Sequence, residues 1–420
     1  MIAHAADQRE ALQRAMAEEL EVVWAQVQQE QDGEAVERRV GEWARKVGRQ
    51  VLEAALQAGV ERVEQAGVRC CGGAMYREVR EPREALTVLG PVKVRRRYFR
   101  CPECRRHQRP ADAWLGWKGG FSFAVEELVA WECSGRAYRE ALGSLRKLAG
   151  LELSVNAAER IVARWGKQEL PRAPYQEAVP HDLVVQVDGA KAHLEEGWKE
   201  IKVGACFSWD RKHPKEDPQE ITYTADWESA EQFRETLWEE ALMRGATTAR
   251  AVAVLGDGAP WIWELASFLF PRATQILDWY HLTEHLWTAA KVVHGEGTEA
   301  TQALAKQWEN EIWEGRSEGV EEHLRELVAA GRDNQDHTLR RGADYLRTHQ
   351  HRLRYHLFRA AGWPIGSGVV EGACKHVVGM RFKRQSTRWT RAGARQVLHL
   401  RLDRLSHRWE ARTKLIRKAA

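Results

Sequence analysis

The sequence has 420 residues, enough for several hydrophobic cores, and its length therefore predicts more than one domain. Hydrophobic residues make up 44% and charged residues 30%, an ordinary balance for a soluble globular protein, and no apolar run approaches the roughly 18 residues that a membrane span needs. The first residues show no signal-peptide pattern and the 7 cysteines are odd in number, so we expect a cytoplasmic protein with reduced or metal-bound thiols.

The net charge of +4 hides two strongly basic zones. Residues 375–420 hold fourteen Lys or Arg against two acidic residues, and residues 90–110 hold eight against one. Local excesses of this kind attract phosphate backbones. A solvated charged surface is the plainer explanation, but two zones, one with three consecutive arginines, favour a nucleic-acid partner.

Helices and a small β-unit are predicted for the first 110 residues. Apolar residues three or four apart predict two amphipathic helices within residues 8–66, broken at residues 31–33. They could pack on the body of the protein or on a second subunit. Strand-like stretches at 85–89 and 92–99 flank Gly90-Pro91, which predicts a turn at those two residues.

Residues 121–169 are typical of three short helices. Ser154 is a good N-cap for the third, which we expect from about Val155 to Lys167. The stretch 170–181 contains three prolines and is predicted to be a linker between domains.

After this linker the pattern becomes α/β. We expect three strands, a helix, a strand, a helix, a strand, a helix, a long all-helical stretch at 298–361, and a last helical region after the break at 363–368. The predicted strands are 183–187, 200–209, 220–224, 251–255 and 273–277. This order favours a mixed sheet with helices packed on it.

Two aspartates are the first candidates for chemistry. Asp188 and Asp257 each stand where a predicted buried strand ends and a glycine follows. Functional side chains gather at the carboxyl ends of strands, and an adjacent glycine lets a ligand come close. An aspartate that caps a turn is the commoner explanation for one such residue, whereas two leave a Mg²⁺ or Mn²⁺ site equally plausible.

A third carboxylate would have to come from a helix beside these strands. Glu371 is the candidate, because it follows a Gly-Ser-Gly turn and opens a helix. On spacing alone, the favoured interpretation is that Glu371 only accepts hydrogen bonds from free N–H groups in the first helical turn.

Several stretches resemble transposases of the ISKra group of insertion sequences and, more distantly, Mutator-like transposases. They are VDGAKAHLEEGWKEIKVGACF (187–207), VLGDGAPWIWELASFLFP (254–271), QILDWYHLTEHLW (275–287) and PIGSGVVEGACKHVVGMRFKRQSTRWTRAGARQVLHLRL (364–402). Upstream, LTVLGPVKVRRRYFRCPECRR (86–106) resembles the segment that such proteins carry before the catalytic domain. The resemblance covers about residues 68–405, and the ordered set of motifs is specific.

The resemblance implies an α/β fold class, an RNase H-like mixed sheet interrupted by an all-helical insertion before the glutamate. A helical N-terminal region, a small β unit like a zinc ribbon and a trihelical, helix-turn-helix-like domain would precede it. The expected ranges are 1–67 for the helical region, 68–115 for the β unit, 116–169 for the trihelical DNA-binding domain, 170–181 for the linker, 182–297 for the catalytic core, 298–362 for the insertion, and 363–420 for the last core helices and basic tail.

The resemblance also implies a DDE transposase in which Asp188, Asp257 and Glu371 hold two Mg²⁺ or Mn²⁺ ions. The reaction would free the 3′ ends of the transposon and join them to target DNA. Terminal inverted repeats and target DNA would be the partners, with a homo-oligomer assembled on DNA and no membrane. Asp278 and His281 match a D-x-x-H motif, and we favour a structural role, with the histidine hydrogen-bonded to the acid, over direct catalysis.

Cysteines form a second candidate site. Cys101 and Cys104 have the spacing of a zinc knuckle, and Cys70 and Cys71 could supply the other pair across a hairpin. Neighbouring cysteines seldom both reach one ion, so His107 could serve instead. A structural Zn²⁺ and a small hairpin with reduced thiols both remain open.

Basic side chains are the candidates for contact with DNA. In the trihelical domain, residues 155–167 would be the reading helix and would present its polar residues outward, although such units also occur as plain packing modules. Trp389 could stack on an unpaired base or lie in the core. The candidate DNA-binding residues are Arg95, Arg96, Arg97, Asn156, Arg160, Arg164, Lys375, Arg381, Lys383, Arg384 and Trp389.

Two other classes compete with a transposase. One is a catalytically inactive, domesticated DNA-binding protein, against which the presence of all three acids argues. The other is an RNase H-like nuclease, which would share the metal site and would cut DNA without joining it.

Overall fold

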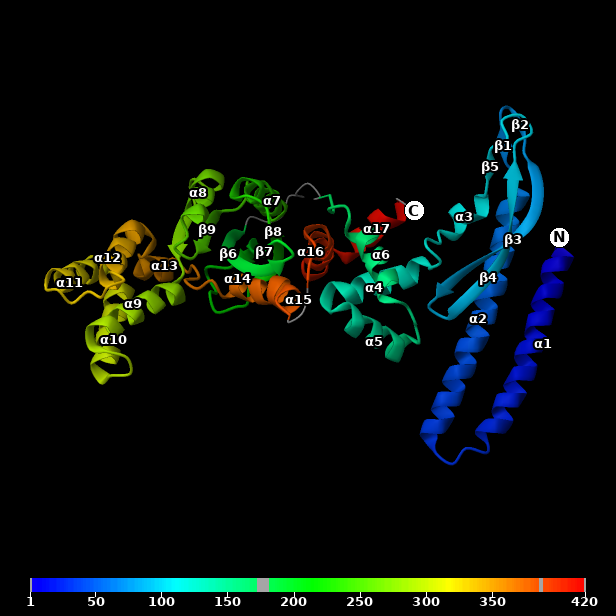
Figure 1. Ribbon diagram of the computed structural model, residues 1–420, viewed down its shortest axis with the longest axis horizontal. Coiled ribbons are helices and arrows are strands. Elements are labelled where there is room, and N and C mark those ends of the chain that lie inside the picture. Colours follow the sequence, from blue (N-terminus) through cyan, green and yellow to red (C-terminus); the bar gives the residue numbers. More distant parts are fainter. Residues whose placement is uncertain (1, 172–180, 385–387, 419–420) are drawn as a thin grey trace. The chain divides into compact units, whose positions relative to one another are not determined.

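The computed structural model describes residues 2–171, 181–384 and 388–418 (Figure 1). The chain divides into two compact units, Met1–Trp165 with Thr413–Ala420, and Gly166–Arg412. The predicted mixed α/β class with a mixed sheet is confirmed. Within the described ranges, no helix is both long and apolar enough to cross a bilayer. Most of the predicted linker 170–181 lies outside the described residues.

The first unit begins with two long helices, as the apolar spacing predicts. They are α1 (Ile2–Val27) and α2 (Gly33–Gln65), and Asp32 caps α2 by accepting the Ala35 N–H at 2.7 Å. A β-unit follows, made of β1 (Arg69–Cys70), β2 (Gly73–Ala74), β3 (Tyr76–Thr87), β4 (Gly90–Arg100) and β5 (His107–Gln108). Val60 of α2 packs with Val92 and Val94 of β4 in one buried cluster.

The hairpin turn of this β-unit lies two residues earlier than predicted. Thr87 pairs with Gly90, so Val88 and Leu89 form the turn and Gly90 and Pro91 belong to β4. Gly90 has φ of 106°, which explains why a glycine stands at the first residue of the strand. The glycine was therefore correctly linked to the turn but placed in the wrong position of it.

Short helices complete the first unit, and the three predicted between 121 and 169 are present. The helices are α3 (Pro110–Leu115), α4 (Phe123–Gly135), α5 (Tyr138–Ala149) and α6 (Val155–Gly166), together with the part of α17 (Trp409–Lys418) that follows Arg412. Ser154 caps α6 as predicted, accepting the Ala157 N–H at 3.2 Å. Trp165 is fully buried against Phe123, with ring centroids 5.3 Å apart.

The second unit is built on one five-stranded sheet with the order β10-β9-β6-β7-β8. β6 (Asp182–Leu194), β7 (Gly197–Trp209) and β8 (Gln219–Asp226) run antiparallel, whereas β9 (Ala251–Gly256) and β10 (Thr274–Leu277) continue the sheet parallel to β6. The first half of β6 is buried on both faces, which explains its continuous apolar sequence.

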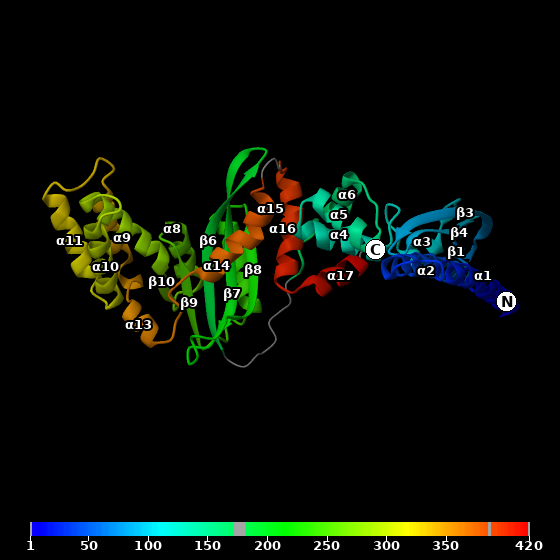
Figure 2. The same ribbon diagram turned by 90° about the horizontal axis from the view of Figure 1, so that it is seen from below.

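Helices cover both faces of this sheet. α7 (Ala230–Met243) and α8 (Pro260–Leu269) lie on one face, and α14 (Gly368–Ala373) lies on the other (Figure 1). Figure 2 shows α14 and the following turns crossing β6 and β7. α14 continues through a π-helical stretch, η2 (Cys374–Gly379), into α15 (Met380–Phe382), and α16 (Arg391–Leu405) lies beside β8.

The predicted helical insertion follows β10. It comprises α9 (Trp279–His294), α10 (Glu299–Trp313), α11 (Ser317–Ala329), α12 (Thr338–His349), the 3₁₀ turn η1 (Gln350–Arg352) and α13 (Tyr355–Ala360). Its buried residues, among them Trp308 and Leu324, belong to the same apolar cluster as the sheet residues Val185 and Leu255. The insertion and the sheet therefore share one core.

A buried ion pair lies within the second unit, near the end of that unit in the sequence. The Arg412 side chain is fully buried, donates from Nε to Asp403 at 2.6 Å and donates from Nη1 to the Gln168 carbonyl at 2.6 Å.

Replacing Arg412 with Met should lower the free energy of unfolding by about 3–5 kcal/mol, because it leaves a buried carboxylate without its partner. Urea unfolding measures this. The double variant Arg412→Met with Asp403→Leu should recover much of the loss, and equal losses in both variants would contradict the assignment.

Candidate functional site

Asp188 and Asp257 lie side by side on two neighbouring parallel strands. β6 and β9 are paired up to Val187 and Gly256, so the next residue of each strand is an aspartate. Asp188 does not end β6 as predicted, because β6 continues to Leu194 in its pairing with β7. Asp188 instead marks the point where the parallel pairing with β9 stops, and this opens the sheet beside both carboxylates.

Each aspartate uses one oxygen to accept a backbone N–H from a residue just after it. Asp188 Oδ1 accepts the N–H of Gly189 at 2.6 Å, and Asp257 Oδ1 accepts the N–H of Ala259 at 2.9 Å. The turn-capping interpretation is therefore correct for Asp257, whereas the Asp188 bond lies within β6 and caps no turn. The cap uses only one of the two Asp257 oxygens, so it is compatible with a ligand on the other.

Glu371 reaches the same site because Gln186 holds the start of α14. The buried Gln186 side chain donates to the Gly366 carbonyl at 3.1 Å and accepts the N–H of Val370 at 3.0 Å. Gln186 and Asp188 are two residues apart on β6 and thus face the same side of the sheet. The residue before Glu371 is in this way attached to the strand that carries Asp188.

Ser367 and Asp278 also help to position Glu371. The Ser367 hydroxyl donates to Glu371 Oε1 at 3.2 Å, and the Ser367 N–H donates to Asp278 Oδ1 at 2.7 Å. Asp278 Oδ2 accepts the backbone N–H of His281 at 2.7 Å and caps α9. Asp278 is 2% exposed and uses both oxygens on backbone groups, which is the structural role favoured for it.

The expected bond between the His281 ring and Asp278 is absent among the described contacts, and this expectation was wrong. Only the backbone of His281 meets the acid, while its ring Nε2 lies 3.4 Å from Nε2 of His285. The residue three positions after an N-cap donates its backbone N–H to the cap, and this bond does not involve the ring.

The three carboxylates share one electrostatic environment. Burial raises the pKa of Asp188, and the charges of Asp257 and Glu371 raise it further, against the lowering effect of the Gly189 N–H and the Cys374 thiol. Cys374, one helical turn after Glu371, donates from Sγ to Asp188 Oδ2 at 3.3 Å. Mutual repulsion of this kind is what a divalent cation offsets.

These carboxylates are not gathered as closely as the ligands of a single ion. Among the described residues, the one group of three or more His, Cys, Asp or Glu whose candidate ligand atoms all lie within 4.8 Å of one another is a set of four cysteines. A pair of ions about 3.5–4 Å apart spreads its carboxylate ligands over a wider space. As they lie in this structure, the three carboxylates do not meet the spacing of a single-ion site.

Tyr345 is a residue of the site that the sequence pattern did not indicate. It comes from α12 of the insertion and lies against the residue after Asp257: a Cβ atom on Gly258 would be 2.2 Å from the Tyr345 ring and 2.7 Å from its hydroxyl. The ring stacks on His285 with centroids 4.5 Å apart. Gly258 was expected to leave room for a ligand, but the room is taken by this tyrosine.

The Tyr345 hydroxyl is buried and has no hydrogen-bond partner among the described residues. Burial raises the pKa of Tyr345, and the charges of Asp257 and Asp278 add to the effect, so the phenol stays protonated and can donate. A buried donor without a partner destabilises a protein by roughly 1–3 kcal/mol. Such a group next to a carboxylate cluster is a candidate donor to a bound ligand.

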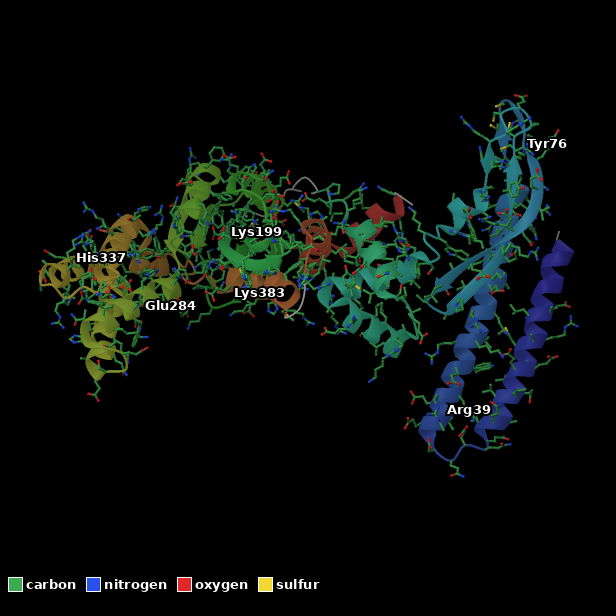
Figure 3. All side chains as sticks on the ribbon, viewed as in Figure 1. Arg39, Tyr76, Lys199, Glu284, His337 and Lys383 are labelled. Atoms are coloured by element: carbon green, nitrogen blue, oxygen red, sulfur yellow. The ribbon has the colours of Figure 1, made fainter. Side chains whose placement is uncertain are left out.

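The predicted DNA-binding residues fall into two classes. Arg95, Asn156, Arg160, Lys375 and Lys383 are exposed, and Figure 3 shows the Lys383 side chain at the end of α15. Burial and the nearby Asp188 raise the pKa of the Cys374 thiol in the carboxylate site, and the charge of Lys383 acts in the opposite direction. Arg97 and Arg384 are half-buried, and Arg384 donates to the Met380 carbonyl at 3.0 Å.

The structure corrects the prediction for the other four. Arg96 is 7% exposed and pairs with Glu81 and Asp112, and Arg164 turns inward to pair with the buried Glu126. Arg381 is 1% exposed, and its guanidinium lies 4.5 Å from the centre of the Trp389 ring. Trp389 is itself buried, so the core interpretation of this tryptophan holds and base stacking would require it to move.

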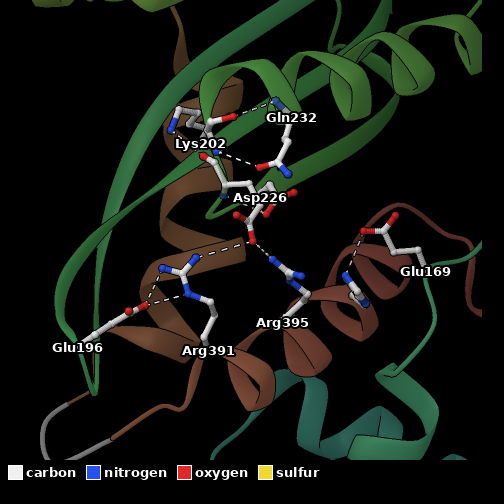
Figure 4. A network of polar contacts seen from close by, with 10 residues as sticks. Glu169, Glu196, Lys202, Asp226, Gln232, Arg391 and Arg395 are labelled. Atoms are coloured by element: carbon white, nitrogen blue, oxygen red, sulfur yellow. Dashed lines mark hydrogen bonds and ion pairs between the residues drawn. The ribbon is translucent and has the colours of Figure 1, made fainter.

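Ion pairs also neutralise part of the basic C-terminal zone. Arg391 of α16 contacts Glu196 at 2.7 Å and Glu228 at 3.7 Å, and Arg395 pairs with the same Glu228 (Figure 4). The Lys202 ammonium donates to the Glu228 carbonyl at 3.0 Å. These arginines attach α16 to the β6–β7 hairpin and to the end of β8, a role that counting charges along the sequence could not reveal.

The four-thiol cluster, Cys70, Cys71, Cys101 and Cys104, lies in the first unit. All four sulfur atoms are within 4.8 Å of one another, and the backbone N–H of Arg106 is the main cause that lowers the pKa of Cys104 to about 7. His107, the alternative fourth ligand, is not in this group and packs against Tyr98 instead, with ring centroids 5.4 Å apart. The structure thus brings together the adjacent pair that the sequence argued against.

Taken together, the second unit defines an α/β protein whose sheet presents two aspartates at the point where parallel pairing ends, with a glutamate supplied by a helix from beyond a helical insertion. The sequence matches the uncharacterised protein family UPF0236 over residues 32–414, and the chain belongs to this family. No curated protein matches it.

Proposed function

We propose that this protein is a DDE transposase that cleaves DNA at the ends of an insertion sequence and transfers the freed strands to target DNA. The observation that carries the proposal is the convergence of Asp188, Asp257 and Glu371 on one site from two adjacent parallel strands and one helix. The sheet order supports an RNase H-like catalytic domain, since three antiparallel strands are followed by two strands parallel to the first.

The donor set suits hard divalent cations. The candidate ligands are carboxylate oxygens, which favour Mg²⁺ or Mn²⁺, and a pair of such ions would activate an attacking oxygen and stabilise the leaving oxygen of a phosphodiester. Asp188, Asp257 and Glu371 would hold the ions, while Gln186 and Ser367 position the glutamate. Asp278 keeps α9 and Ser367 in place and takes no further part.

Other residues of the site would bind the DNA strand itself. The exposed Lys375 and Lys383 follow the helix that carries Glu371 and suit contacts with phosphate oxygens. The buried Tyr345 hydroxyl, held protonated beside Asp257, would donate to a phosphate oxygen at the reaction centre.

The first unit offers candidates for contact with the terminal repeats. Asn156 and Arg160 are exposed on α6, the helix expected to read DNA, and Arg95 is exposed on β4. An amide and guanidinium groups suit base edges and phosphate oxygens respectively. These three residues are therefore the ones that we propose for binding the ends of the element.

A cleavage and joining assay tests the proposal. The purified chain is incubated with Mg²⁺ or Mn²⁺ and with labelled DNA taken from both flanks of its own gene, together with a plasmid target. We expect 3′-hydroxyl nicks at defined positions, joined products in the plasmid, and neither with EDTA. Cleavage without joining would identify a nuclease, and binding without cleavage would identify a domesticated DNA-binding protein; either result contradicts the transposase.

A further inference from the structure

The adjacent cysteines of the four-thiol cluster point the same way because the backbone between them turns back sharply. Cys70 pairs with Gly73 across β1 and β2, which leaves Cys71 and Gly72 as a two-residue turn. Cys71 has φ of 49° and Gly72 has φ of 80°, so both residues are left-handed, as a type I′ turn requires. This turn brings the Cys70 and Cys71 sulfur atoms to 3.8 Å from each other.

The left-handed backbone at Cys71 is unusual for a residue with a side chain. Asn, Asp and Gly are the residues that commonly occupy this position of the turn, and the next two residues here are glycines. A cysteine in this conformation persists when its side chain is needed where the turn places it. Arg69 closes the turn by donating from Nη2 to the Gly72 carbonyl at 3.1 Å.

The second pair is held by a loop of its own. The Cys101 N–H donates to the Arg106 carbonyl at 2.9 Å, and the Arg105 N–H donates to the Cys101 carbonyl at 3.1 Å. Arg105 is again left-handed, with φ of 59°, which curls residues 101–106 around Cys104. This loop places Cys104 Sγ 3.5 Å from Cys70 Sγ.

These distances are those of sulfur atoms around one ion. In a tetrahedral site with metal–sulfur bonds of about 2.3 Å, neighbouring sulfur atoms lie about 3.8 Å apart. Two separations in the cluster, 3.5 and 3.8 Å, are close to this edge, and all other pairs lie within 4.8 Å. None of these four cysteines forms a disulfide.

We propose that the four-thiol cluster binds one Zn²⁺ ion and that the left-handed turn lets the vicinal pair Cys70–Cys71 supply two of its ligands. Thiolates are soft ligands and select Zn²⁺ over Mg²⁺, so this site is chemically distinct from the carboxylate site. The exposed Arg69, Arg105 and Arg106 beside the cluster offset the net negative charge of four thiolates around one dication.

The ion would stabilise an end of the β-unit that lacks a core of its own. The apolar cluster there consists of Met75, Phe99 and Cys101, with Val68 and Cys70 packed against it. So few side chains cannot by themselves fix β1, β2 and β5, and a metal closes such small units by linking their loops.

Metal analysis of the intact chain tests the inference, and it does not depend on the proposed catalytic function. We expect about one Zn²⁺ per chain after purification without chelators, measured by plasma mass spectrometry. Thiol reagents should leave the four-thiol cluster unmodified until a chelator removes the ion. A reduced, folded chain that neither retains Zn²⁺ nor takes up added ZnCl₂ would overturn the proposal, as would a Cys70–Cys104 disulfide in the freshly isolated protein.

The variant Cys71→Gly distinguishes two possible roles of Cys71, as a metal ligand or only as a residue of the turn. Glycine adopts positive φ freely, so this variant should fold at least as well at the turn if Cys71 has no ligand role. We expect instead that its affinity for Zn²⁺ falls by more than the roughly 100-fold that loss of an outer hydrogen-bond partner causes. His107→Ala, the matched control, should keep wild-type affinity. Unchanged affinity in Cys71→Gly, or a loss confined to His107→Ala, would show that the vicinal pair does not bind the ion.

Discussion

Cleavage of end-containing DNA should fall by more than roughly 1000-fold when Asp257 is replaced by Asn or Glu371 by Gln, which corresponds to about 4 kcal/mol of transition-state stabilisation. Both substitutions keep the shape of the side chain and remove the charge that a divalent cation requires. The amide oxygen introduced by Asp257→Asn could still accept the Ala259 N–H, so the turn after β9 should survive. The effect is measured as a single-turnover nicking rate with saturating Mg²⁺.

Three comparisons make this result specific. The double variant should be no slower than the slower single variant, because residues that act as a unit are not additive. Asp210→Asn, which alters an exposed acid in the same unit, should cleave like the wild type. Mg²⁺ or Mn²⁺ should raise the melting temperature of the wild type and not that of Asp257→Asn. Full activity in either single variant would remove these carboxylates from the mechanism.

Tyr345→Phe should lower the nicking rate by about 100-fold while leaving the free protein as stable as before or more stable by about 1 kcal/mol. The change removes a hydroxyl that is buried beside Asp257 without a partner among the described residues, and it keeps the ring that stacks on His285. Urea unfolding and single-turnover nicking are measured on the same preparation. A variant with a lower nicking rate and an unchanged or higher free energy of unfolding would identify a hydroxyl that acts on a ligand. A hydroxyl that only packs would not lower the nicking rate in a protein of unchanged stability.

Tyr355→Phe is the matched control for this experiment. The Tyr355 hydroxyl is also buried, but it donates to the Leu277 carbonyl at 3.0 Å. Removing it strands a buried acceptor and should lower the free energy of unfolding by about 1–3 kcal/mol. If Tyr345→Phe lowered the free energy of unfolding in the same way, its hydroxyl would have a partner inside the protein. If the variant cleaved DNA as fast as an active wild type, the hydroxyl would have no role toward DNA.

Much of the sheet could be predicted from the sequence because its strands are continuous apolar runs. Leu183–Val187 and Ala251–Leu255 are largely buried. A continuous apolar run of this length is typical of a strand that is covered on both faces of its sheet. The positions of Asp188 and Asp257 follow from these runs, since each lies just beyond one. The extent of β6 beyond Asp188 could not be predicted in this way, because its pairing with β7 leaves one side exposed.

The third carboxylate could not be found from local pattern. Glu371 is placed by contacts of Gln186 with residues 180 and 184 positions away, and nothing in the residues around Glu371 encodes them. The resemblance to transposases supplied this residue, and the structure supplies a physical reason why it lies near the aspartates. Tyr345 was missed for the same reason. The glycine at position 258 is explained by the close approach of the Tyr345 ring, which leaves no space for a side chain there.

Charge and aromatic patterns were the least reliable guides. Arg96 and Arg381 stand in basic stretches that suggest exposure, and Arg164 stands on the expected reading helix, yet each is held by acids or rings from elsewhere in its unit. Trp389 lies among arginines in sequence and among Phe382 and Arg381 in space. The cysteines show the reverse case, since adjacency argued against a shared ion until the left-handed backbone at Cys71 was known.

The two hydrogen bonds of the Gln186 amide close a loop of about 180 residues. The entropy lost on closing a flexible loop grows only with the logarithm of its length, so doubling the intervening chain would add about 0.6 kcal/mol. Segments inserted between the helices α9 to α13 would therefore leave the distance between Asp188 and Glu371 unchanged, provided that α12 keeps its place over Gly258. The site can in this way tolerate large changes in the size of the insertion while its acids stay in register with a single strand.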